Sequence, residues 1–133
     1  MKPFLDTNIL VYANSNDPRK PAALACLATG GIVSVQVLNE FANVLRKKQQ
    51  RSWNEITQAL DDVRNLLEPP LTLTLDIHLS ALTLARVRNL NLYDALIVAA
   101  ALEAGCTELL SEDLQDGCTF NGVTIRNPFI GSQ

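Results

Sequence analysis

Four carboxylates stand where the chain is expected to leave a strand or to begin a helix. Asp6 follows the short apolar pair Phe4–Leu5 and precedes a helical pattern. Glu40 lies beside the apolar stripe of one predicted helix, Asp94 is the early charge of another, and Asp113 follows a short predicted strand. Ligands of parallel sheets bind at the carboxyl ends of the strands, so all four side chains can face one crevice.

Four carboxylates in one crevice repel each other, and the arrangement makes physical sense only with bound metal. The chain has a single histidine, His78, and no Cys-x-x-Cys pair, which disfavours a zinc site. His78 lies among apolar residues of a predicted helix and is expected to be structural or on the surface. An all-oxygen site suits Mg²⁺ or Mn²⁺. A Ser-His-Asp triad, a Gly-x-Gly-x-x-Gly loop and a Walker A sequence are all missing.

Each acid also has a plainer interpretation. Asp6 could simply cap the helix that follows it, and Asp94 could complete a capping arrangement with Asn91. Asp113 could be one acid of a solvated loop. Three neighbouring polar residues could be turn residues or could orient a ligand: Thr7, Asn8 and Ser111.

Strand and helix patterns alternate along the chain, which indicates an α/β protein with a parallel sheet. The expected strands are Phe4–Leu5, Ile32–Val35, Leu71–Thr74, Glu108–Leu110 and Val123–Arg126. Helical patterns occupy the segments between them and end at residues near 29, 48, 68, 90 and 104. Two boundaries are marked clearly, by the capping box that Ser52 and Glu55 form and by Gly105 after the last helix.

Length and composition predict a single domain over residues 1–133 with an aliphatic core, since 47% of the residues are hydrophobic and only 5% are aromatic. The longest apolar run, Ala95–Leu102, is too short to cross a bilayer, and no export signal is visible. The three cysteines are widely spaced and odd in number, which favours free thiols in a reducing cytoplasm.

The net charge of −3 does not exclude a nucleic-acid partner. If four of the 14 acids are neutralised by metal, 10 acids remain against 11 bases, which leaves +1 for the rest of the surface. A basic group at the end of one predicted helix could contact RNA phosphates or could be a solvated helix end that suits the helix dipole: Arg46, Lys47, Lys48 and Arg51.

Taken together, these motifs resemble a PIN domain, and within it the VapC-type ribonuclease toxins of bacterial toxin–antitoxin pairs. The resemblance runs along the whole chain and rests on Phe4–Leu10, Glu40, Tyr93–Ile97, Ser111–Asp113 and the Asn127-Pro128-Phe129 ending. It implies a five-stranded parallel sheet in the order 3-2-1-4-5 with helices on both faces. It also implies a homodimer and inhibition by a cognate antitoxin protein.

For the site, the resemblance implies Mg²⁺- or Mn²⁺-dependent cleavage of RNA. The metal ligands it implies are Asp6, Glu40, Asp94 and Asp113, with Asn8 and Ser111 in support and Asp116 as an additional acid. Two other functions compete. One is an inactive PIN-like scaffold that binds RNA or protein. The other is an aspartyl-phosphate hydrolase, although Asn8 stands where that chemistry usually has a second Asp.

Overall fold

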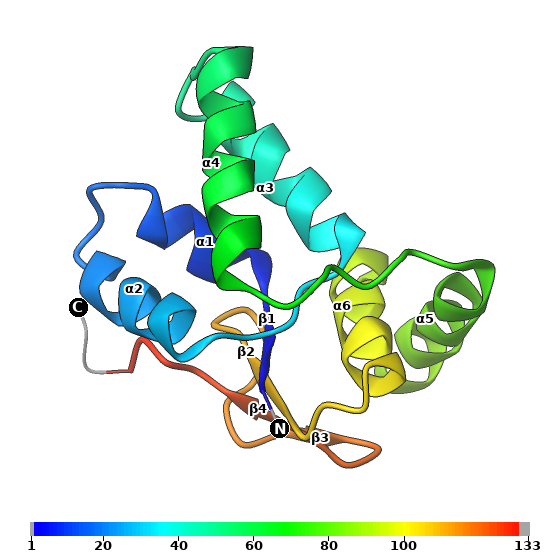
Figure 1. Cartoon of the computed structure of the whole chain (residues 1–133). Coiled ribbons are helices and arrows are strands. Elements are labelled where there is room, and N and C mark those ends of the chain that lie inside the picture. Colours follow the sequence, from blue (N-terminus) through cyan, green and yellow to red (C-terminus); the bar gives the residue numbers. More distant parts are fainter. Residues whose placement is uncertain (1, 131–133) are drawn as a thin grey trace.

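The computed structural model describes residues 2–130, and a short sheet forms its centre. The elements follow in the order β1 (Phe4–Leu5), α1 (Thr7–Ala13), α2 (Lys20–Thr29), α3 (Val35–Lys47), α4 (Trp53–Leu66), α5 (Leu75–Arg88), α6 (Leu92–Glu103), β2 (Glu108–Leu110), β3 (Thr119–Phe120) and β4 (Val123–Arg126). Figure 1 shows α1 and α2 on one side of the sheet and α5 and α6 on the other, with α3 and α4 side by side above it.

The described sheet has four strands in the order β1-β2-β4-β3. Strands β1, β2 and β4 are parallel, and β3 pairs antiparallel with β4. The α/β prediction is confirmed, but the five-strand count and its order are not.

The expected second and third strands are reduced to single parallel bridges, which join Ile32 to Phe4 and Ser34 to Leu71. The reason is that helices begin at once. The Ser34 hydroxyl accepts a hydrogen bond from the Val37 N–H (3.2 Å) and caps α3, so Val35 is already helical. Thr74 caps α5 in the same way.

Strand β3 was not expected. It forms a hairpin with β4 through Asn121 and Gly122, whose φ values of 48° and 96° are the positive angles that a tight two-residue hairpin turn requires. The Asn-Gly pair is a recognised hairpin signal, and it makes the sheet mixed instead of purely parallel.

The core lies between the sheet and α6. Both residues of β1 are completely buried, as are Leu109 of β2 and Ile125 of β4. Residues 95–101 of α6 are all buried, which confirms that its apolar sequence belongs to an interior helix. Asp94 therefore lies at the N-terminal end of an interior helix, next to the carboxyl edge of the sheet.

No helix within residues 2–130 is both long enough and apolar enough to span a bilayer. All three cysteines are free, and His78 is exposed on α5, as expected.

Candidate active site

Asp6 follows β1 and is the most buried acid of the chain, with 3% of its surface exposed. One carboxylate oxygen accepts a hydrogen bond from the Thr7 N–H (2.6 Å), and the other accepts one from the Ser111 hydroxyl (2.6 Å). Burial outweighs these two bonds and raises the pKa of Asp6 to about 7. The charges of Asp113 and Asp94 raise it further. Asp6 does cap the start of α1, as the plainer interpretation predicts, but it also lies within electrostatic range of two other acids.

Ser111 is completely buried and occupies the position after β2 that corresponds to Asp6 after β1. Its hydroxyl donates to Asp6 and accepts a hydrogen bond from the Asp113 N–H (3.2 Å). One side chain thus fixes Asp6 and the start of the loop that carries Asp113.

Glu40 reaches the same edge from α3. One of its oxygens accepts a hydrogen bond from the Thr7 hydroxyl (2.6 Å), and the other accepts one from the Gln36 amide (3.2 Å). Thr7 is the first residue of α1 and is buried, so Glu40 lies directly beside the helix that Asp6 begins.

Asp94 is a capping residue as well as a member of this group. Its N–H donates to the Asn91 side-chain oxygen (2.9 Å), and its carboxylate accepts from the Asn91 amide (2.8 Å). Burial raises the pKa of Asp94, and the negative charges of Asp113 and Glu40 raise it further. The capping bond with Asn91 lowers the pKa but does not cancel these effects.

Asp113 is the exposed member of the group. Desolvation raises its pKa, followed by the charges of Glu112 and Glu40. Asn8 donates from one amide nitrogen to Asp113 (3.1 Å) and to Glu112 (3.3 Å). Each of the four predicted acids therefore lies within electrostatic range of at least two of the others. We call Asp6, Glu40, Asp94 and Asp113 the carboxylate cluster.

The carboxylate cluster has the chemistry of a site for a hard divalent cation. Its donors are all oxygens, with no histidine or cysteine among them, and burial together with repulsion raises the pKa of Asp6, Asp94 and Asp113. Across residues 2–130, however, no three acidic, histidine or cysteine side chains are already close enough to hold one ion. Each carboxylate is instead bonded to a neighbouring amide, hydroxyl or N–H, as expected where negative charges repel each other.

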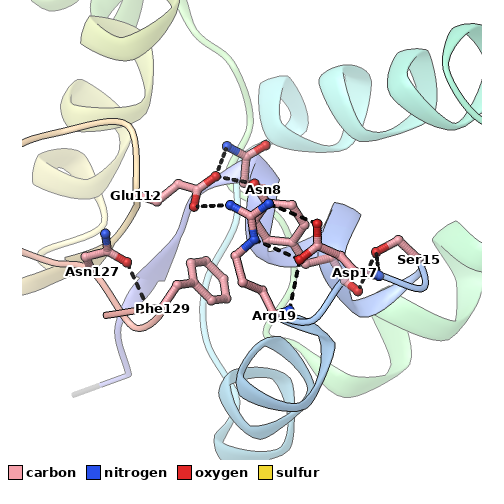
Figure 2. A network of polar contacts seen from close by, with 8 residues as sticks. Asn8, Ser15, Asp17, Arg19, Glu112, Asn127 and Phe129 are labelled. Atoms are coloured by element: carbon pink, nitrogen blue, oxygen red, sulfur yellow. Dashed lines mark hydrogen bonds and ion pairs between the residues drawn. The ribbon is translucent and has the colours of Figure 1, made fainter. Parts of the chain in front are cut away.

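A second polar network, missed by the sequence interpretation, surrounds Glu112 (Figure 2). Its carboxylate accepts hydrogen bonds from the Tyr12 hydroxyl and from Arg19 (3.1 Å), in addition to the bond from Asn8. Arg19 is also held by Asp17 (2.8 and 2.9 Å) and stacks 4.0 Å above the centre of the Tyr12 ring. Burial raises the pKa of Tyr12, and the hydrogen bond to Glu112 raises it further.

Glu112 and Asp113 therefore differ although they are neighbours. Glu112 faces Tyr12 and Arg19, whereas Asp113 lies within range of Glu40 and Asp94. The useful sequence signal was Arg19, a cation close to the first helix that could offset one acid of the Glu112–Asp113 pair.

Among residues 2–130, the remaining predicted residues form no hydrogen bond with the carboxylate cluster. The Asp116 carboxylate accepts a hydrogen bond from the Asn127 N–H (2.8 Å), so it links the loop after β2 to the segment after β4. Arg46 donates to the Arg51 carbonyl oxygen (3.0 Å) and lies over Trp53, with 4.6 Å to the ring centre. Lys47 and Lys48 are exposed at the end of α3.

Comparison with known proteins gives the family. The family model described as the PIN domain matches residues 4–115, which include the whole carboxylate cluster. No curated protein matches the chain.

Two solved structures share the fold. The structure of Mycobacterium tuberculosis VapC20, a toxin that cleaves the sarcin-ricin loop, has a TM-score of 0.67 and 20% identity, with 83% of this chain and 90% of that chain covered. A toxin–antitoxin complex from Klebsiella pneumoniae has a TM-score of 0.71 and 23% identity, with 95% and 97% covered. With the family model covering most of its length, the chain belongs to the PIN domain family.

Proposed function

We propose that the chain, as a single PIN-like domain over residues 1–133, is a metal-dependent endoribonuclease and the toxin of a type II toxin–antitoxin pair. The observation that carries this proposal is the gathering of four carboxylates at the carboxyl edge of the sheet, which come from the end of β1, from α3, from the start of α6 and from the loop after β2. Membership of the PIN family and the fold shared with two toxin structures support it.

In this proposal Mg²⁺ or Mn²⁺ is held by Asp6, Glu40, Asp94 and Asp113. When bound, the ion supplies neutralisation of the scissile phosphate and activation of the attacking water. A buried acid with a pKa near 7 is otherwise protonated for much of the time at neutral pH, so the ion competes with a proton at Asp6.

The chain's own residues orient the cluster. Ser111 fixes Asp6, Thr7 fixes Glu40, and Asn8 holds Asp113. Each donates a hydrogen bond to a carboxylate oxygen and so fixes the direction of that carboxylate. Asp116 is not needed in this scheme because its carboxylate is bonded to the Asn127 N–H.

The proposed partners are RNA, a cognate antitoxin and a second copy of the chain. The surface of α5 favours a homodimer, because Leu75, Leu79 and Leu82 recur at helical spacing and are 69%, 50% and 44% exposed. An RNA substrate and three free cysteines are in keeping with a cytoplasmic location.

Cleavage of a mixed RNA pool tests the proposal. We expect fragments with Mg²⁺ or Mn²⁺ and none in excess EDTA or with the Asp6→Asn variant. Cleavage that continues in EDTA would contradict the role of the metal. RNA binding without cleavage would indicate an inactive scaffold, and release of phosphate from a small phosphomonoester would indicate a hydrolase of another class.

Expression in a bacterial host tests the toxin part of the proposal separately. We expect the wild-type chain to slow growth in the absence of an antitoxin, while Asp6→Asn does not. Equal growth inhibition by the two chains would show that ribonuclease chemistry is not the cause.

A further inference from the structure

A polar pocket of about 490 Å³ lies between the loop after α1 and the end of α3. Its lining includes Asn14, Asn16, Lys20, Gln49 and Arg51. We propose that this pocket binds a backbone phosphate of the RNA strand, away from the carboxylate cluster. The inference rests on the proposed ribonuclease function and adds a second contact to it.

The charge of the pocket fits an anion. Two cations, Lys20 and Arg51, line it, and no acidic residue does. The nearest acid in sequence is Asp17, whose carboxylate is bound by Arg19 and whose pKa is lowered to about 2 by that contact. Among residues 2–130, neither Lys20 nor Arg51 forms a salt bridge. Lys20 is therefore available to a ligand, whereas Arg51 already donates to the Asn14 carbonyl oxygen and lies within electrostatic range of Glu55.

Carbonyl groups at a helix end would ordinarily oppose an anion here, because α1 ends beside the pocket. Several of these oxygens already accept hydrogen bonds. The Leu10 oxygen accepts from the Asn14 amide (2.9 Å), and the Tyr12 oxygen accepts from the Ser15 hydroxyl (3.0 Å). The Asn14 oxygen accepts from the Arg51 guanidinium (2.6 Å). These bonds offset the negative end of the helix dipole. The sign of the electrostatic potential in the pocket is therefore set by its cations.

The pocket stands at a useful distance from the cluster. Asp6 caps the start of α1, and Ala13 at its other end lines the pocket. Seven helical residues at 1.5 Å each span roughly 10 Å. For a strand that keeps the stacked rise of double-stranded DNA, about 3.4 Å per nucleotide, this distance would correspond to roughly three nucleotides. A single RNA strand could thus place one phosphate at the cluster and another in the pocket.

Salt-dependent RNA binding tests the pocket. The parent protein is the Asp6→Asn variant, which binds without cutting, and the ligand is a labelled pool of random 12-nucleotide RNAs in Mg²⁺. The test variants are Lys20→Gln and Gln49→Glu, neither of which removes the Arg51 contact to Asn14. The matched control is Lys2→Gln, since Lys2 is an exposed lysine at the opposite, amino end of β1.

We expect Lys20→Gln to weaken binding several-fold at low salt and to reduce the slope of log affinity against log salt by about 0.7, the value for one lost phosphate contact on a single strand. Gln49→Glu should weaken binding in the same direction. Lys2→Gln should match the parent. If Lys20→Gln and Gln49→Glu behave like Lys2→Gln, the pocket is not a phosphate site, although the proposed function stands. If the parent binds no RNA at all, both proposals fail.

The length of the RNA gives a second readout. Pools of two nucleotides are too short to reach both places, whereas pools of four or more can reach from the cluster to the pocket. Affinity should therefore rise steeply with length in the parent and in Lys2→Gln, and much less in Lys20→Gln. An equal rise in Lys20→Gln would overturn the proposal.

Discussion

Replacing Asp6 by Asn should change how the stability of the metal-free protein depends on pH. Asn keeps the shape of Asp and can still accept from the Thr7 N–H while it donates to the Ser111 hydroxyl. What it removes is the titration of a buried acid. The comparison therefore isolates the charge of Asp6 from its role as a cap.

The sign and size of the change in the free energy of unfolding follow from the raised pKa of Asp6. Unfolded Asp6 loses its proton near pH 3.8, whereas folded Asp6 keeps it until about pH 7. Between these values the folded state binds more protons, so the free energy of unfolding falls as pH rises. About 3 pKa units at 1.36 kcal/mol each give a loss of about 4 kcal/mol as an upper value. The loss should be absent below pH 4 and complete above pH 7.

Urea unfolding followed by circular dichroism at pH 4, 5.5 and 7.5, after treatment with chelator, measures this effect. The advantage of Asp6→Asn over wild type should grow across the series. Asp17→Asn is a suitable control, because the pKa of Asp17 is lowered to about 2 and the stability that it contributes changes only below about pH 4, so its effect should be constant across this series. A difference between Asp6→Asn and wild type that does not change with pH would refute the assignment of Asp6 as a buried acid with a raised pKa.

Three further predictions concern other residues. Asp94→Asn removes repulsion, so its melting temperature without metal should equal or exceed that of wild type. Mg²⁺ should raise the melting temperature of wild type and raise that of Asp94→Asn much less. A normal Mg²⁺ response of the variant in thermal melts would show that Asp94 is only a cap. Arg19→Met should break the ion pair with Glu112 and alter the Mg²⁺ affinity measured by calorimetry, and the double variant with Glu112→Gln should largely restore the wild-type affinity. Independent effects of the two substitutions would argue against a link between this ion pair and the carboxylate cluster. Leu79→Asp should yield monomers in light scattering, and an unchanged dimer would place the interface elsewhere.

Much of the helical framework could be predicted because its signals are local. The capping box of Ser52 and Glu55 and the left-handed Gly105 are present where the sequence placed them. The burial of α6 followed from its continuous apolar sequence. These features depend on residues within a few positions of each other.

The sheet was harder to predict because strand length depends on where helices begin. Ser34 and Thr74 lie in segments that were predicted to be strands, yet each uses its hydroxyl to cap a helix. The competition between a strand and a cap is decided by packing, which a local pattern does not report. The short β3 could have been found from Asn121-Gly122, a signal that the strand pattern around it did not reinforce.

The carboxylate cluster was predicted from strand ends and helix starts, and in the structure each of the four acids lies within electrostatic range of at least two of the others. Whether they ligate metal stays a prediction. The network of Glu112, Arg19 and Tyr12 could not be predicted, because it joins residues about 100 positions apart through side-chain directions alone.

The bond between the Ser111 hydroxyl and Asp6 joins two residues that are 105 positions apart. During synthesis, Asp6 leaves the ribosome long before its partner exists. At about 5 to 20 residues per second, roughly 5 to 20 s pass between the two. Strand β1 likewise cannot pair until β2 has been synthesised, because β2 is its only full strand neighbour in the described sheet. Unfinished chains that stop before Ser111 therefore lack the assembled site.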